Sequence, residues 1–263
     1  MNRSRIRPPA VAGMFYPAEI RELRRMVKQY LAEAEDTGTD PRAVIGPHAG
    51  FVYSGPVAGS AYKQLEGQWD SIRRVVLLGP SHHVPLRGLA AGCATAFETP
   101  LGLVPVDQEA VTELLRFSQV RVMDAAHEPE HSLETHLPFL QSVLEDFSIV
   151  PLVVGDTEPE AVCEIIDWFA DRSDTLMAVS SDLSHYHDYE SARRLDEATS
   201  RAIEDLNPDA IQFEQACGRI PIQGLLLHAQ RHNLKARTVD LRNSGDTAGP
   251  RDRVVGYGAY VFS

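Results

Sequence analysis

Four short segments of the chain carry side chains that can bind a metal ion or move a proton. They contain histidine, cysteine and aspartate, and each lies at or near the end of a predicted helix or strand. The segments are residues 47–50, 80–83, 180–185 and 217–219. Two imidazoles and one thiolate from such segments, beside a further histidine and aspartate, would form a metal pocket with a proton-transfer group next to it.

Two of these segments are histidine-containing turns. His48 directly follows Pro47 and lies two residues before Gly50, and His82 and His83 follow a Gly-Pro-Ser sequence. Glycine and proline enforce turns in which the backbone can approach a ligand closely. His48 alone fits a hydrogen-bonded turn residue as well as a metal ligand. Adjacent imidazoles point in different directions, so one of His82 and His83 can bind metal while the other shapes the pocket or caps the loop.

The third segment pairs a carboxylate with an imidazole. Asp182 and His185 are three residues apart, a spacing that predicts that they meet on one turn of a helix. Asp182 would then fix the tautomer of His185, which would serve as a general acid or base. An ordinary helix N-cap at Ser181 or Asp182, with an exposed His185, fits the same pattern.

Cys217 lies in a break between two helical patterns, and the charge of the neighbouring Arg219 favours a thiolate. The alternative for an isolated cysteine is a small buried apolar residue. Cys93 and Cys163 have no comparable surroundings and are interpreted as structural. Three cysteines are too few and too irregularly spaced for a disulfide framework, which favours a reducing cytoplasm.

A further pair, His131 and Glu134, begins an amphipathic stretch and can reach the pocket as an outer shell. The same residues, with Ser132, also fit an ordinary helix start. The remaining histidines are assigned to surface or core positions: His127, His187, His228 and His232. The last two have the i, i+4 spacing of a metal pair, but no third ligand lies near them in the sequence.

The elements that must position these residues alternate along the chain. Short apolar, β-branched runs predict buried strands over residues 43–45, 74–78, 148–154 and 175–179. Apolar residues at helical spacing predict helices over residues 107–117, 133–147, 158–169 and 189–206. This alternation predicts an α/β fold, with a central mostly parallel or mixed sheet flanked by helices.

Three of the four segments directly follow predicted strands. Ligands of open α/β sheets gather beyond the carboxyl ends of the strands, so His48, His82 and Asp182 are expected on one rim. Residues 253–262 alternate like a strand, antiparallel and near an edge, and residues 243–250 have the composition of a loop.

Bulk properties limit the classes of partner. At 263 residues, without a linker-like stretch, the chain is predicted to form a single domain over residues 1–263. The net charge of −12 opposes binding to nucleic acid or to an anionic membrane surface. Arg3, Arg5 and Arg7 resemble the start of a signal peptide, but no continuous apolar region follows them. No export signal is predicted.

Taken together with three longer motifs, these residues resemble the Memo family, called AmmeMemoRadiSam system protein B in microbes. The motifs occupy residues 7–17, 47–55 and 131–134, and the resemblance runs from about Arg7 to the final strand. The family is similar in fold to the class III extradiol ring-cleaving dioxygenases, which implies a non-haem metal pocket at the same rim.

Carried over residue by residue, the resemblance implies that His48, His82 and Cys217 hold the metal. It places Asp182 and His185 beside it, with His185 at the base position of the dioxygenases. Ring-cleaving enzymes use two histidines and a carboxylate, whereas a thiolate is softer and can itself be oxidised. Catechol cleavage is therefore not expected.

The leading hypothesis is a cytoplasmic, dioxygenase-like oxidoreductase that holds Fe(II) or copper, with zinc also possible, and acts on an unidentified small molecule or peptide. One alternative is a non-catalytic module that binds a peptide or small ligand or sequesters copper. Another is a metal-dependent hydrolase. The resemblance also implies a pathway shared with a radical S-adenosylmethionine protein and an AMMECR1-like protein.

Overall fold

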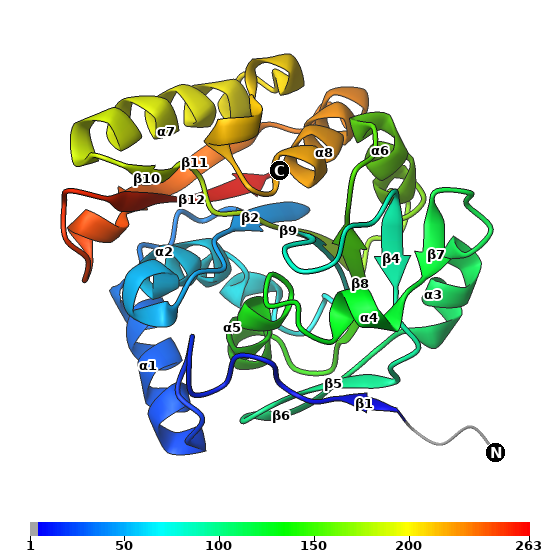
Figure 1. The fold of residues 1–263 in the computed structure, drawn as a ribbon. Helices are drawn as coiled ribbons and strands as arrows, with labels where there is room; N and C mark the ends of the chain where they lie inside the picture. The colour runs from blue at the N-terminus through cyan, green and yellow to red at the C-terminus, as the bar shows by residue number, and fades with distance from the viewer. Residues whose placement is uncertain (1–4) are drawn as a thin grey trace.

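The centre of the molecule is a mixed β-sheet, seen in a computed structural model that describes residues 5–263 (Figure 1). The strands lie in the order β10 (His185–His187), β12 (Val254–Phe262), β2 (Ala43–Gly46), β9 (Thr175–Ser180), β3 (Arg74–Pro80), β8 (Ser148–Val154), β4 (Leu89–Ala91) and β7 (Val120–Val122), and β11 (Ala236–Asn243) pairs with β12. Arg3 lies outside the described residues.

Strands β2, β9, β3 and β8 run parallel to one another, while β12 and β4 flank them in the antiparallel direction. All four strands predicted from apolar runs are therefore present, and the predicted α/β class with a mixed sheet is confirmed. The final strand is antiparallel to β2, as expected. It lies one position inside the edge because β10 and β11 both pair with it.

Helices cover both faces of the sheet (Figure 1). One face carries α6 (Pro159–Asp167), α7 (Tyr189–Glu204) and α8 (Arg219–His232), and the other carries α1 (Ile20–Glu33), α2 (Phe51–Lys63) and α5 (Leu137–Val143). Two further helices, α3 (Gln108–Leu114) and α4 (Asp124–His127), contact β8 and β4, respectively. Five 3₁₀ turns among the described residues are η1 (Glu66–Gln68), η2 (Glu134–His136), η3 (Pro208–Ala210), η4 (Phe213–Gln215) and η5 (Ser244–Asp246).

Local capping chemistry determines where several helices begin. The side chain of Asp107 accepts a hydrogen bond from Ala110 N at 2.9 Å at the start of α3. Asp188 accepts one from Ser191 N at 3.0 Å at the start of α7. A carboxylate at this position satisfies a free helical N–H and stabilises the positive end of the helix dipole.

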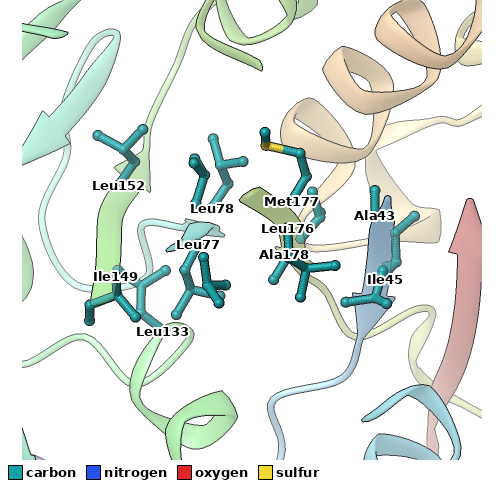
Figure 2. Close-up of a cluster of buried hydrophobic side chains, with 14 of the residues drawn as sticks. Ala43, Ile45, Leu77, Leu78, Leu133, Ile149, Leu152, Leu176, Met177 and Ala178 are labelled. Carbon is teal, nitrogen blue, oxygen red and sulfur yellow. The ribbon is translucent and has the colours of Figure 1, made fainter. Parts of the chain in front are cut away.

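The core lies on both faces of the parallel strands. Leu77 and Leu78, neighbours on β3, point to opposite faces, and both are fully buried (Figure 2). Side chains alternate along a strand, so a continuous apolar run is the expected sequence of a strand covered on both sides. This double burial fixes the strand register, and with it the positions of the residues that follow each strand.

A separate three-stranded sheet holds the N-terminal segment against the domain. It consists of β1 (Ile6–Arg7), β5 (Ala96–Thr99) and β6 (Gly102–Pro105), with β1 parallel to β5. Among residues 5–263, no helix combines the length and apolar character needed to cross a membrane.

Candidate metal centre

Three strand ends converge on one rim, as the sequence predicts. His48 follows β2, His82 follows β3 and Asp182 follows β9, each two residues beyond the last strand residue. These three strands are parallel neighbours, so their carboxyl ends meet at one edge of the sheet. The ring centroids of His48 and His82 lie 5.0 Å apart.

A chain of hydrogen bonds fixes the tautomer of His48. Ser180 donates its hydroxyl proton to the carbonyl oxygen of Ser132 at 2.6 Å, and the same hydroxyl oxygen lies 2.6 Å from His48 Nδ1. The Ser180 oxygen must then accept, so His48 Nδ1 carries the ring proton. Burial lowers the pKa of His48 well below its usual range. The ring is therefore neutral, and the lone pair of Nε2 is free to bind a metal.

His82 is fixed in the same way, by a carboxylate. Glu130 accepts hydrogen bonds from His82 Nδ1 at 2.8 Å and from His82 N at 2.7 Å. It also accepts from the backbone nitrogens of His131 and Ser132, at 3.0 and 2.9 Å. Burial alone would raise the pKa of Glu130, but hydrogen bonds and the nearby His82 lower it to about 2. The ionised carboxylate therefore leaves Nε2 of His82 free.

His131 lies with the two turn histidines, closer to the centre than an outer-shell position. Its ring stacks on that of His82, with centroids 4.7 Å apart and planes inclined by 19°. One ligand atom from each of His48, His82 and His131 lies within 4.8 Å of the other two. Burial lowers the pKa of His131 to about 4. Three imidazoles placed in this way can hold a metal ion.

Cys217 approaches the same rim from the loop before α8. Its Sγ lies 3.4 Å from His48 Nε2 and accepts a hydrogen bond from Asp182 N at 3.3 Å. Burial, together with the nearby Asp182 carboxylate, raises the pKa of the thiol to about 12. The thiol is protonated at neutral pH, so a metal ion must displace its proton to bind the sulfur.

Gly218 allows this approach. A Cβ atom at residue 218 would collide with the carbonyl oxygen of Ser180 and lie 2.7 Å from Ser181 Cβ. The Gly218 nitrogen instead donates to Ser181 Oγ at 2.9 Å. The glycine therefore brings Cys217 down onto the end of β9.

The expectation that Asp182 and His185 share a helical turn is wrong. The chain stays extended after β9, because Leu183 and Gly256 pair through the backbone at 2.8 Å. His185 begins β10, and α7 begins only at Tyr189. Asp182 accepts a hydrogen bond from His48 N at 2.8 Å, whereas His185 Nδ1 donates to the carbonyl oxygen of Leu183 at 2.8 Å.

Glu134 faces the N-terminal segment. Its buried carboxylate pairs with the Arg7 guanidinium and accepts from Ala10 N at 2.7 Å, Val11 N at 3.0 Å and Tyr16 Oη at 2.5 Å. These contacts fasten the N-terminal segment to η2, three residues from His131. Glu134 thus supports the pocket through the backbone.

A cavity of about 620 Å³ opens beside the centre. His82, His185 and Cys217 line it, together with Arg219 and two exposed aromatic residues, Tyr186 and Phe213. His83 is exposed, with its ring centroid 6.5 Å from that of His82. The volume is sufficient for a small molecule or a peptide side chain.

Two supporting residues were not given roles from the sequence, namely Glu130 and Ser180. Glu130 lies 48 residues from the His82 that it orients, and no local spacing links them. Ser180 is in a segment singled out for its aspartate and histidine, but its partner His48 is 132 residues away. The strand order brings Ser180 to His48, and the packing of the loop after α4 against the end of β3 brings Glu130 to His82.

Comparison with known proteins identifies the family. The family model described as Memo-like protein matches residues 7–261. A MEMO1 family protein from Aquifex aeolicus is 35% identical over 269 residues, which cover 98% of this chain and 99% of the relative. Another from Ignicoccus hospitalis is also 35% identical, covering 98% of each chain, and one from Nitrosopumilus maritimus is 32% identical, covering 98% of this chain and 99% of its own length. The matched region includes every strand end that builds the histidine-rich rim, and the chain belongs to the Memo family.

Proposed function

We propose that this protein is a metal-dependent oxidoreductase whose ion is held by His48, His82 and Cys217. One observation carries the proposal. Both imidazoles are fixed through Nδ1 by partners outside the pocket, which leaves each Nε2 free, and the Cys217 sulfur lies 3.4 Å from Nε2 of His48. The two imidazoles therefore need little reorganisation when the ion enters, whereas the Cys217 thiol must give up its proton.

Iron(II) or copper is the expected ion, because imidazole and thiolate donors suit both, although zinc fits the same donors. Bound there, either redox-active metal would supply electrons to oxygen or another small oxidant. His131 is a competing donor, since it forms a three-histidine group with His48 and His82. The third donor is therefore either the Cys217 sulfur or the His131 ring, and substitution of each residue in turn can decide between them.

His185 is proposed to move protons. Its Nδ1 donates to a backbone carbonyl, so Nε2 is free, and the ring lines the cavity in which a substrate would lie. Asp182 is proposed as a positioning residue: it accepts from His48 N, and its own N–H donates to Cys217 Sγ. It thereby links the turn that carries His48 to the loop that carries Cys217.

The test is metal content and affinity of anaerobically purified protein, followed by spectra after oxygen is admitted. We expect Cys217→Ser to weaken binding by about ten-fold or more, whereas Cys93→Ser, at an exposed cysteine, should have no effect. His185→Ala should keep the ion and lose the oxygen-dependent reaction. Full affinity in Cys217→Ser with loss in His131→Gln would replace the proposed ligand set by three histidines.

A binding module without turnover is the second candidate, favoured by the exposed aromatic rim of the cavity. Phe213 is 82% and Tyr186 is 64% exposed. Such rings present apolar area to a peptide or a small ligand. An ion that stays in one oxidation state in the presence of oxygen would favour this candidate. The proposed pathway link to a radical S-adenosylmethionine protein and an AMMECR1-like protein is compatible with either function.

A further inference from the structure

We infer that the protein has a second site for a divalent transition-metal ion, such as Zn²⁺, formed by Asp167, His228 and His232. These residues lie at the opposite end of the sheet from the Cys217 pocket. The hollow beside them is lined by Thr175, the first residue of β9, whereas Ser180, the last residue of the same strand, supports His48. The two sites are thus separate.

The side chains of this cluster already converge. His228 Nδ1 lies 2.6 Å and His232 Nε2 lies 3.2 Å from the same oxygen, Asp167 Oδ1. The two ring centroids are 4.3 Å apart. One ligand atom from each of the three residues lies within 4.8 Å of the other two. An ion can therefore be bound after small side-chain movements.

The donor set suits zinc and its neighbours in the periodic table. Two imidazoles and one carboxylate are three of the ligands that such ions prefer, and water can supply a fourth. His228 and His232 are one turn apart on α8, and Asp167 is the last residue of α6, which packs against α8. The third ligand missing near these histidines in the sequence thus comes from a neighbouring helix.

Solvent can reach the cluster. His228 is buried, but the His232 side chain is 40% exposed, and both rings line a hollow of about 180 Å³. Water molecules in this hollow can complete the coordination of an ion. The ion would replace the two ring protons that now face Asp167 Oδ1. To bind the ion, each imidazole would carry its proton on the other ring nitrogen.

Arginine side chains near Asp167 repel a cation and compete with it for the carboxylate. Arg231 Nη1 lies 2.6 Å from Asp167 Oδ2, but its side chain is 51% exposed and free to turn away. Arg42 and Arg172 also line the hollow. Removing the competing guanidinium should tighten metal binding, while removing a ligand should weaken it. A purely structural hydrogen-bond network predicts no metal binding in either variant.

The experiment is a calorimetric titration of the full chain, stripped with a chelator, with Zn²⁺ alone. In His48→Ala protein, where the Cys217 pocket lacks one donor, one zinc ion should still bind. Adding His232→Ala should weaken that event by about ten-fold or more. In the same His48→Ala background, Arg231→Gln should instead raise the zinc affinity by roughly two- to five-fold, which corresponds to the energy of one exposed ion pair.

Thermal unfolding gives a second readout. Zinc should raise the melting temperature of His48→Ala protein, because the ion joins α6 to α8 in the folded state only. It should not raise that of the double variant. The inference is overturned if His48→Ala protein binds no zinc, or if His232→Ala leaves the affinity unchanged. Loss of one ion in His232→Ala, with none lost in His48→Ala, would instead support this site and contradict the proposed ligand set at the Cys217 pocket.

Discussion

The two histidine clusters of this molecule use similar side chains in opposite ways. At the Cys217 pocket, His48 and His82 turn Nδ1 away from the cavity, toward Ser180 and Glu130. At the other end of the sheet, His228 and His232 turn their nitrogens toward the acid of their own cluster, Asp167. The first cluster holds its lone pairs ready for an ion, whereas the second satisfies its own polar groups.

This difference shows that the hydrogen-bond partners of a histidine determine how easily it can bind a metal ion. A histidine whose second nitrogen is fixed elsewhere is pre-oriented, and binding costs little reorganisation. A histidine already bonded to the neighbouring carboxylate must first break that bond. We therefore expect tighter metal binding at the Cys217 pocket than at the Asp167 cluster.

Glu130→Gln should have the largest effect on the Cys217 pocket, because Glu130 orients His82. The amide keeps the size of the side chain but cannot accept all four hydrogen bonds from His82, His131 and Ser132. We expect metal affinity to fall by about 10- to 100-fold, and the free energy of unfolding to fall by roughly 3 kcal/mol. Metal titration and urea unfolding measure the two effects. Glu128→Gln, at an exposed neighbour, should change neither.

His127 is a buried histidine outside both clusters, and it makes the stability of the folded protein depend on pH. Burial lowers the pKa of His127 from 6.5 to about 4. Between these values the unfolded chain binds a proton that the folded protein excludes. Stability is therefore complete above the higher value and is lost as the pH falls, by about 2 kcal/mol near pH 5 for this residue.

His127→Gln should remove this part of the pH dependence, because an amide can still donate to the carbonyl oxygen of Ala90, as the ring now does at 2.9 Å. Urea unfolding of metal-free protein at neutral and mildly acidic pH gives the slope. If both proteins lose stability in parallel, the acid sensitivity originates elsewhere.

Ser180→Ala should weaken metal binding by removing a single hydrogen bond of the Cys217 pocket. His48 Nδ1 loses the acceptor that fixes its tautomer, while the Nε2 donor itself is kept. We expect metal affinity to fall about ten-fold. Ser142→Ala is a suitable control, because its hydroxyl bonds only within α5, to Pro138 O at 2.7 Å. Unchanged affinity in Ser180→Ala would show that the Cys217 pocket does not depend on this orientation.

Asp167→Asn should have the smallest effect. The carboxylate contacts His228, His232 and Arg231, but its side chain is 27% exposed, so water can replace lost partners. We expect about 1 kcal/mol less stability and no change in the ion held at the Cys217 pocket. Asp171→Asn, at an exposed aspartate of the next loop, serves as the control in urea unfolding.

The sequence predicted the strands and the shared rim because both depend on local pattern and simple topology. Continuous apolar runs mark strands buried on both faces, and parallel strands place His48 and His82 at one edge. The spacing of Asp182 and His185 misled, because three residues can separate neighbours on a helix or on an extended chain. Backbone pairing with β12 decided between the two.

Supporting contacts between distant residues could not be predicted from one sequence. Glu130 reaches His82 across 48 residues, and Asp167 reaches His228 across 61. Each pairing depends on loops and helices packing together after the sheet forms. The same limit explains why Glu134, expected near the pocket, bonds to a segment more than 100 positions before it in the chain.

The position of β12 has a consequence for biosynthesis. Its residues 260–262 pair with Ala43, Val44 and Ile45, so the partner of β2 is made after every other strand of this sheet. Until then, the hydrogen-bonding edge of β2 is open to another chain. Contacts so distant in sequence close late and slow the completion of the fold. A chain cut short before β12 would leave this edge unpaired and prone to aggregation.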